Sequence, residues 1–544
     1  MTLLKNGQEQ YDAFVRDVLQ DSKKSIHEPI SKNNYNLMST PVKKTNSTAS
    51  TKVQLLKHNN EIFSQLVAIL QQRKVSLLKV FSFELHSFSP SISNFGDLHH
   101  SSDKGELLSL LKSPCHNLPE DLAEFRPDAS VILDGEMLPE HFPPKKSMTF
   151  REYAEMLGKE ILSAYFFIFG RIDIVFNTFV EGSVKTAVRK KQNCKQVIRR
   201  HVAPTNLCPD NWKSFLKDPI NRKQLNIVLA ELLTSLTYQQ NRQLIVTCQR
   251  KVLTSGSLEM EESNIEDARC RILLHVKHAL TEGISRIKII TFDEDVPIVG
   301  LGVYHLLRSQ HHFEDIVIEL GTGKKHQTIS LNELATSLGP LHCQALPFFH
   351  CLTGANLTSA FKGVGKKKAY QALKAYKEAE QTLADMYTTP FQDLTENDTK
   401  FRIIERFIII CYSRTSELSS INEARIQLYF AGKKDIEHIP PTQDALLLHV
   451  KRSLYETGML KNCLTSQQSL PSPLSYGWKE SDDHDIKWEP EWIKGKEASR
   501  EVREFVKCGC KNVCTHTSRC SCSAASLRCT LLCSCKCQNR VSFD

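Results

Sequence analysis

The sequence predicts an α/β fold with a parallel sheet flanked by helices. From about residue 126 to residue 321, short apolar runs alternate with longer segments of helical periodicity. Such alternation is typical of βαβ units, which place neighbouring strands parallel. A chain of 544 residues is also long enough for several domains and at least one large core.

Each expected strand is a short apolar run, and three of the five end in a polar residue. The five runs are SVILDG, ending at Asp134, RIDIVFN, ending at Asn177, RQLIVTC, RIKIITFDED, ending at Asp293 and Asp295, and EDIVIELG. Three expected helices lie between them: TFREYAEMLGKEIL, EDARCRILLHVKHAL and VPIVGLGVYHLL. Thr149 and Glu152 form a capping box at the first, Gly283 closes the second, and Pro297 suits the first turn of the third.

The remaining chain predicts four further regions around the α/β domain, which we place at residues 119–385. Residues 1–118 are expected to be helical, because Leu56, Ile62, Phe63, Leu66 and Leu70 recur at roughly helical spacing. Residues 386–465 form a helical extension, and residues 466–500 form a tethering or docking linker. Residues 501–544 contain a dense cysteine cluster.

Composition limits the class of protein. The chain is 41% apolar and 24% charged, as in ordinary globular proteins, and its net charge of +9 permits an acidic partner without requiring one. No apolar run reaches the ~18 residues of a membrane helix, and the N-terminus has no secretory signal pattern. We therefore expect an intracellular protein without a membrane partner. No P-loop or other motif predicts a small-molecule cofactor.

Half of the 18 cysteines lie in one short segment near the C-terminus. They are Cys508, Cys510, Cys514, Cys520, Cys522, Cys529, Cys533, Cys535 and Cys537. In a reducing compartment such density indicates metal binding rather than disulfides. Zinc prefers four soft ligands, so nine thiolates satisfy about three ions if three of them bridge. The alternative is a tail of unmetallated thiols.

The order of these cysteines, with RCSC in the middle and CKCQN at the end, resembles the CXC domain of the tesmin-like proteins. Some members of that family bind DNA, and the family carries a tyrosine before the central pair, where this chain has Arg519. The resemblance therefore implies zinc binding more firmly than sequence-specific DNA recognition. The cluster's basic residues either hold phosphate or form a solvated face: Lys511, Arg519, Arg528, Lys536 and Arg540.

Acidic residues follow the predicted strands. Asp134, Asn177, Asp293 and Asp295 come directly after strands, and Glu266 and Asp267 open a helix. Strand ends of a parallel sheet meet at one edge, so as many as five carboxylates could gather there. Like charges at that density require cations such as Mg²⁺ or Mn²⁺, whose pairs cut phosphodiesters. Singly, each acid also suits a turn or a helix cap.

Two basic segments are candidates for contact with nucleic acid. Gly363 and Gly365 precede Lys366, Lys367 and Lys368, an arrangement that suits a helical hairpin presenting N–H groups and lysines to a phosphate. A glycine turn before a basic helix is also a common structural feature. The second segment follows Asn177 and contains Lys185, Arg189, Lys190, Lys191, Arg199 and Arg200, which equally suit a solvated helix.

Together these pieces resemble the flap endonuclease branch of the PIN-like nucleases. More closely, the chain is similar to transposon-derived proteins that join such a domain to a C-terminal cysteine cluster. The resemblance rests on VILDG, DIVFN, ILLHVKHA, FDEDV, LPFFHCLTGANLTSAF, SPLSYGW and the terminal cysteines, in that order. It implies a nuclease fold of mobile-element origin, with the basic segment after Asn177 covering the nucleic-acid path.

The resemblance also implies a depleted metal site. Asp134, Asp267, Asp293 and Asp295 match acidic positions, together with Glu266, whereas Asn177, Arg269 and Asn356 stand where the family has acids. Asparagine brings no charge, and arginine adds a fixed positive charge where a divalent ion would sit. We expect Arg269 to pair with Asp267, Asp293 or Asp295, which weakens Mg²⁺ or Mn²⁺ binding. The alternative is that Arg269 faces solvent and one metal ion still binds.

Three functional hypotheses follow. The first is a nuclear, nucleic-acid-binding protein with an inactive or severely impaired nuclease domain, with DNA as the expected ligand and RNA as the alternative. The second is an active metal-dependent nuclease acting on branched or single-stranded DNA. The third is a protein–protein adaptor that uses the N-terminal helices and Trp478, Trp488 and Trp492.

Overall fold

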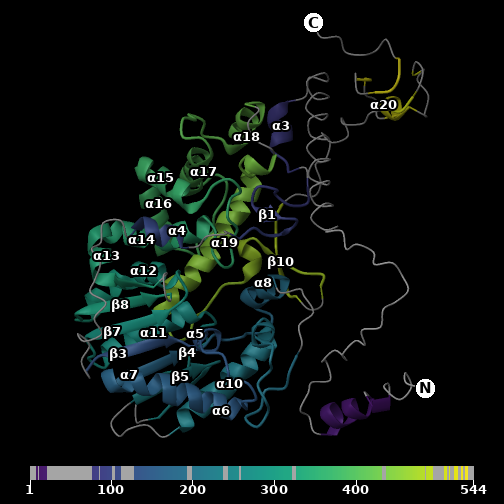
Figure 1. Cartoon of the computed structure of the whole chain (residues 1–544). Coiled ribbons are helices and arrows are strands. Elements are labelled where there is room, and N and C mark those ends of the chain that lie inside the picture. Colours follow the sequence, from purple (N-terminus) through teal and green to yellow (C-terminus); the bar gives the residue numbers. More distant parts are fainter. Residues whose placement is uncertain are drawn as a thin grey trace.

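The computed structural model describes most of the chain between residues 76 and 493 and parts of both ends (Figure 1). The described ranges are 8–9, 11–20, 76–84, 86–100, 105–111, 128–192, 199–236, 243–255, 259–321, 326–431, 436–483, 486–493, 508–510, 514, 520–524, 528–530 and 533–536. The helix predicted around Leu56 to Leu70 lies outside them.

A seven-stranded sheet forms the centre, in the order β6-β5-β4-β3-β7-β8-β9. The five predicted strands are all present, and they pair with one another in parallel: β3 (Ser130–Asp134), β4 (Arg171–Val175), β5 (Gln243–Cys248), β7 (Arg286–Thr291) and β8 (Asp315–Leu320). The edge strands β6 (Lys251–Thr254) and β9 (Gln327–Ser330) are antiparallel and were not predicted. The predicted α/β class is thus confirmed.

Helices cover both faces of this sheet (Figure 1). Val131 and Leu133 of β3 face one core, which α6 (Phe150–Leu157) and α10 (Pro219–Ser235) complete. Ile132 faces the opposite core, built with α11 (Ala268–Thr281) and α12 (Val296–Gln310). Because strand side chains alternate, a strand buried on both faces reads as a continuous apolar run, which is why it was recognisable.

Local signals fix the helix ends as predicted. Thr149 and Glu152 form the capping box that begins α6. Asp267 caps α11 by accepting the Arg269 N–H, and Gly283, at φ +82°, follows the end of that helix. Pro297 lies in the first turn of α12. The cap of α11 matters for function, because it places an acid at the strand ends.

A further layer of helices extends away from the sheet (Figure 1). It comprises α13 (Leu331–Leu338), α14 (Pro340–Leu352), α15 (Lys366–Ala375), α16 (Lys377–Thr388), α17 (Thr399–Tyr412), α18 (Ile421–Phe430) and α19 (Gln443–Lys461). The long helix α19 contacts α12 and α14 and so reaches the side of the sheet where α11 lies. Among the described helices, none has both the length and the apolarity to span a bilayer.

The structure also describes short elements. They are η1 (Val15–Gln20), α3 (Leu77–Phe81), β1 (Ser93–Asn94), β2 (Asp97–Leu98), α4 (Glu106–Leu111), α5 (Met137–His141), η3 (Gly158–Leu162), α7 (Ser163–Ile168), α8 (Val184–Gln192), α9 (Trp212–Phe215), η5 (Ile436–His438), η6 (Asn462–Leu464), η7 (Pro473–Tyr476) and α20 (Ser521–Ala524).

The described part of the segment expected to be a linker is folded against the α/β domain. Its strands β10 (Trp478–Glu480) and β11 (Trp488–Pro490) form an antiparallel hairpin. The indole N–H of Trp488 donates to the Gly182 carbonyl, and that of Trp492 donates to the Gly96 carbonyl, each at 2.9 Å. The three tryptophans are therefore buried within the chain rather than offered to a protein partner.

Candidate functional site

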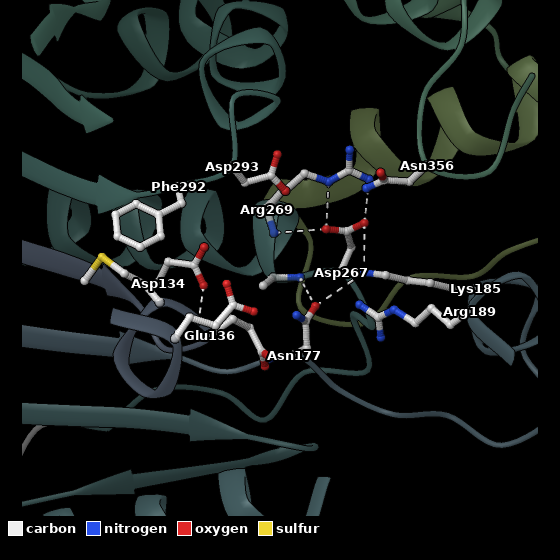
Figure 2. A pocket seen from close by; sticks show the side chains of 13 residues that line it. Asp134, Glu136, Asn177, Lys185, Arg189, Asp267, Arg269, Phe292, Asp293 and Asn356 are labelled. Carbon is white, nitrogen blue, oxygen red and sulfur yellow. Dashed lines mark hydrogen bonds and ion pairs between the residues drawn. The ribbon is translucent and has the colours of Figure 1, made fainter. Parts of the chain in front are cut away.

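Polar residues meet at the carboxyl ends of β3, β4 and β7, around a cavity of about 230 Å³ (Figure 2). The chain runs outward from β3 in both directions, so this is the point where strand order reverses, the usual ligand position in such sheets. Its lining residues are Asp134, Glu136, Met137, Glu140, Asn177, Lys185, Arg189, Asp267, Ala268, Arg269, Phe292, Asp293 and Asn356. Of the strand-end residues predicted from sequence, Asp134, Asn177 and Asp293 line this cavity and Asp295 does not.

Asp134 and Asp293 form the carboxylate side of the cavity. Asp134 accepts hydrogen bonds from the Glu136 N–H at 3.1 Å and the Thr291 hydroxyl at 2.8 Å. Burial, and then the Glu136 charge, raise the pKa of Asp134 to about 7. Burial, and then the charge of Asp295, raise the pKa of Asp293 to about 6. Raised values indicate carboxylates whose negative charge the fold does not fully compensate.

Asn177 uses its side-chain oxygen within the protein. That Oδ1 accepts the Ala268 N–H at 3.2 Å and the Lys185 ammonium at 3.4 Å. Its backbone N–H donates to Glu136 Oε1 at 3.1 Å. An amide oxygen can serve as a metal ligand, but this one is already engaged by a backbone donor and a cation.

Glu136 is an acid that sequence reasoning missed. Besides the Asn177 N–H, it accepts a hydrogen bond from Asn226 at 2.7 Å and pairs with Arg222 at 3.1 Å. Both partners come from α10, which lies on the opposite face of the sheet from α11. Its only sequence signal was its position two residues after Asp134.

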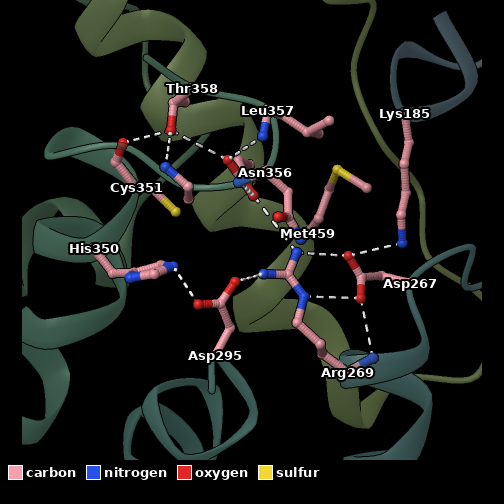
Figure 3. A network of polar contacts seen from close by, with 12 residues as sticks. Lys185, Asp267, Arg269, Asp295, His350, Cys351, Asn356, Leu357, Thr358 and Met459 are labelled. Carbon is pink, nitrogen blue, oxygen red and sulfur yellow. Dashed lines mark hydrogen bonds and ion pairs between the residues drawn. The ribbon is translucent and has the colours of Figure 1, made fainter. Parts of the chain in front are cut away.

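Arg269 occupies the other side of the site as a buried cation (Figure 3). Its guanidinium binds both oxygens of Asp267, with Nε to Oδ1 at 3.0 Å and Nη2 to Oδ2 at 2.6 Å. Its Nη1 lies 2.8 Å from Asp295 Oδ2. Of the three carboxylates expected as partners, the structure pairs Arg269 with these two. Its side chain is 3% exposed, so it does not face solvent.

The charges within this network reinforce one another. Burial alone would raise the pKa of Asp267, but Arg269 and Lys185 lower it well below the ordinary value. Burial alone would lower the pKa of Arg269, but Asp267 and Asp295 raise it well above the ordinary value. Lys185 lies 3.0 Å from Asp267 Oδ2 and adds a second cation. Asp267 and Arg269 therefore remain charged, as in a buried salt bridge whose partners are well matched.

Two further residues of this network come from distant helices and were not predicted. Glu456 of α19 lies 3.5 Å from Arg269 and accepts the backbone N–H groups of Asn356 and Leu357 at 3.2 and 3.0 Å. His350 of α14 lies 3.1 Å from Asp295. Asn356 thus lines the cavity on a loop that Glu456 holds in place (Figure 3).

Glu266 departs from the expected constellation. Its carboxylate accepts hydrogen bonds from the hydroxyls of Ser183 at 2.8 Å and Thr186 at 3.3 Å. It lines a neighbouring cavity rather than the one that contains Asp134. Consecutive residues before a helix point in different directions, so Glu266 and Asp267 serve different cavities.

The acidic site does not fit the two divalent ions expected for phosphodiester cleavage. Among the residues that the structure describes, groups of three or more ligand atoms within 4.8 Å of one another occur in the cysteine cluster and not here. The guanidinium of Arg269 takes up Asp267 and Asp295, two of the expected ligands. A fixed cation repels a divalent ion in the same position.

The glycine turn places its lysines differently from one another. Gly363 has φ +75°, which suits a glycine, and Gly365 precedes α15. The Lys366 ammonium is buried and contacts His350 and Thr353 at 3.1–3.2 Å, so it is not offered to a phosphate. Lys367 is exposed, and Lys368 is half-buried beside the Tyr412 ring.

The basic helix α8 divides in a similar way. Lys185 is buried against Asp267, and Lys191 pairs with Asp97 and Glu489 at 3.8 and 3.6 Å. Arg189 lies over the Phe179 ring and lines the acidic cavity, whereas Lys190 is exposed. Farther along, Arg199 is exposed and Arg200 is half-buried.

The cysteine cluster contains two sets of four thiols close enough to share a metal ion. One set is Cys508, Cys529, Cys533 and Cys535, and the other is Cys508, Cys510, Cys514 and Cys520. Cys508 belongs to both, as a bridging thiolate would. Cys522 Sγ also lies 3.6 Å from Cys533 Sγ, while Cys537 lies outside the described residues. This geometry fits a thiolate-bound metal such as zinc.

Comparison with solved structures finds similar chains. One of them is the T5 D15 protein, in a "Crystal Structure of T5 D15 Protein Co-crystallized with Metal Ions", which is 10% identical over 62% of this chain and 98% of that one. The TM-score is 0.28, too low to carry an argument. No family model and no curated protein matches the chain.

Proposed function

We propose that this protein binds nucleic acid through a nuclease-like α/β domain whose acidic site no longer supports metal-dependent hydrolysis. The observation that carries the proposal is the buried guanidinium of Arg269, which binds Asp267 and Asp295 at 2.6 and 2.8 Å. It supplies, as a fixed side chain, positive charge that metal ions provide in a two-metal nuclease.

The ion pairs of the carboxylates in the site support the same conclusion. Arg269 and Lys185 occupy Asp267 and Asp295. The other carboxylates that line the cavity are Asp134, Glu136, Glu140 and Asp293. Glu136 is held by Arg222 and Asn226. The site thus retains an acidic cavity but not the converging set of free ligands that two cations require.

The cysteine cluster supports a second, structural metal function. We propose that it binds about three zinc ions and that metal binding supplies its folding energy, as in other short thiolate modules. Its described basic residues Arg528 and Lys536 are exposed and suit phosphate contact. The resemblance of the sequence to transposon-derived proteins supports DNA as the ligand, a nuclear location and a mobile-element origin.

Two measurements on the purified full chain test the proposal. Binding of fluorescein-labelled single-stranded, duplex and flapped DNA is measured by fluorescence anisotropy, with RNA of matched sequence for comparison. Cleavage of the same DNAs is then measured with 5 mM Mg²⁺ or Mn²⁺, alongside the Asp293→Ala/Asp295→Ala variant. The proposal predicts binding without cleavage.

Cleavage by the natural sequence that disappears in the double variant would show an active nuclease and overturn the assignment. Absence of binding to every nucleic acid tested would contradict the other half of the proposal. Binding should weaken steeply as salt rises, because contacts to phosphate release counterions.

A further inference from the structure

A second cavity adjoins the acidic site and has a different character. Its volume is about 450 Å³, roughly twice that of the first, and Lys185 lines both. The start of α8, the loop before α11, helix α19 and the segment 468–473 with β11 enclose it. Cavities of this size accommodate small molecules or a single nucleotide unit.

The segment expected to be a linker builds one wall of this cavity. Asn264 and Gln468 hold each other there, with the Gln468 N–H donating to Asn264 Oδ1 at 2.7 Å and Asn264 Nδ2 donating to the Gln468 carbonyl at 2.9 Å. Trp488 is anchored to Gly182 on the opposite wall. The cavity is thus formed by contacts between parts of the chain that are far apart in sequence.

Charge and exposure divide the cavity into a mouth and an interior. Arg250 and Lys487 are exposed, so their cationic groups belong to the mouth. Neither forms an ion pair with any residue in the described part of the chain. The interior contains the buried aromatic residues Tyr455 and Trp488 and the buried acid Glu266. Lys487 Nζ lies 5.2 Å from the Trp488 ring centre.

This arrangement selects the chemical class of the ligand. The cationic mouth attracts an anion. In the interior the Lys185 ammonium is already paired with Asp267, so the carboxylate of Glu266 repels an anion there. Aromatic walls favour a flat ring, and a carboxylate accepts hydrogen bonds from exocyclic amino groups of bases. A nucleotide, with its phosphate at the mouth and its base inside, satisfies all three features.

We propose that this cavity, formed by Arg250, Glu266, Tyr455, Lys487 and Trp488, holds one nucleotide of a single strand beside the acidic site. The proposal rests on the proposed nucleic-acid function and adds a defined subsite to it. The shared wall at Lys185 makes the strand continuous from one cavity to the next.

The test compares two charge-reversal variants of equal net charge. Arg250→Glu/Lys487→Glu alters the mouth, and Lys213→Glu/Lys217→Glu alters two exposed lysines that do not line the cavity. Affinity for a fluorescein-labelled 15-mer of deoxycytidine is measured at one fixed salt concentration. We expect at least tenfold weaker binding by the first variant and less than a threefold change in the second, because only the first alters the mouth of the cavity. All four substituted residues are exposed, so both proteins should fold.

A photochemical readout locates the base. An oligonucleotide carrying 5-iododeoxycytidine is irradiated with the natural protein, and cross-linked peptides are identified by mass spectrometry. Cross-links at Tyr455 or Trp488 support the subsite. Equal weakening in both variants, or cross-links confined to other segments, would overturn it while leaving nucleic-acid binding intact. No oligonucleotide binding by the natural protein would instead contradict the proposed function itself.

Discussion

The Arg269 guanidinium donates two hydrogen bonds to the Asp267 carboxylate, from Nε at 3.0 Å and from Nη2 at 2.6 Å. Both side chains are almost completely buried, and Asp295 and Glu456 lie on the guanidinium's other sides. One cation therefore links α11, α12 and α19 at the point where strand order reverses.

Removing the guanidinium should destabilise the fold. In Arg269→Ala, the acids Asp267, Asp295 and Glu456 remain buried without the guanidinium, while Asp267 keeps its ion pair with Lys185; losing such a buried partner typically costs about 3–5 kcal/mol. Arg269→Lys keeps the charge but loses the paired geometry, so its loss should be smaller. Urea unfolding of both variants measures this. The control is Arg286→Ala, at the partly exposed pair with Glu314, which should change stability by about 1 kcal/mol or less.

The raised pKa of Asp134 predicts how stability depends on pH. Folded Asp134 keeps its carboxyl proton up to about pH 7, whereas the ordinary pKa of an aspartate is 3.8. The unfolded chain loses this proton first, so the free energy of unfolding falls as pH rises between the two values. Asp134→Asn should equal the natural protein near pH 4 and exceed it at pH 8, by at most about 4 kcal/mol. Urea unfolding at both pH values, without Mg²⁺ or Mn²⁺, tests this. Exposed Asp210→Asn is the control, and a variant that is no more stable at pH 8 would contradict the account.

The shared thiol predicts unequal losses of metal. Cys508 belongs to both four-cysteine sets and Cys510 to only one, so Cys508→Ser should lose more zinc per chain than Cys510→Ser. Metal content is measured by inductively coupled plasma mass spectrometry after gel filtration. Cys270→Ala, which removes a core thiol far along the chain from the cluster, should retain the full content. Equal losses from the two cluster variants would show that Cys508 does not bridge.

We expect the described part of residues 466–500 to stabilise the body formed by the sheet and its helices. Trp492 is buried, and its indole N–H donates to the Gly96 carbonyl. Arg452 Cζ lies 4.8 Å from the centre of the Trp492 ring. Trp492→Ala should therefore destabilise the protein by about 3–5 kcal/mol. Leu474→Ala, at an exposed residue of the same segment, should change stability by about 0.5 kcal/mol or less. Thermal unfolding measures the loss of stability in each variant. Near-equal losses would mean that the contacts of Trp492 contribute little to stability.

The sequence predicted the strands of the sheet better than its edges. Parallel strands buried on both faces appear as continuous apolar runs, and β3, β4 and β7 were found that way. The edge strand β6 is exposed or half-buried throughout, so it carries no such run. The segment containing Trp478 and Trp488 is rich in proline and serine, which suggested a linker. Its contacts with Gly96 and Gly182 depend on tertiary structure that local pattern does not encode.

The sequence predicted the site residues that directly follow strands. It did not predict the partners that helices of the outer layer supply. Asp134 and Asp293 end strands, and parallel topology alone brings them together. Glu456 and His350 lie inside helices of the outer layer, far along the chain from the sheet. The sequence did contain a signal, because Glu456 and His350 are polar residues placed among apolar residues of their helices. That signal indicates burial with a partner but does not name the partner.

The most direct test of the central claim is cleavage by a protein in which the missing acids are restored. Asn177→Asp, Arg269→Asp and Asn356→Asp are combined, and cleavage of flapped and single-stranded DNA with Mn²⁺ is compared with that of the natural sequence. We expect no cleavage by the natural protein and metal-dependent cleavage by the restored one, abolished by adding Asp293→Ala. Cleavage by the natural protein, lost on Asp293→Ala/Asp295→Ala, would contradict it and make Asn177 and Asn356 working ligands.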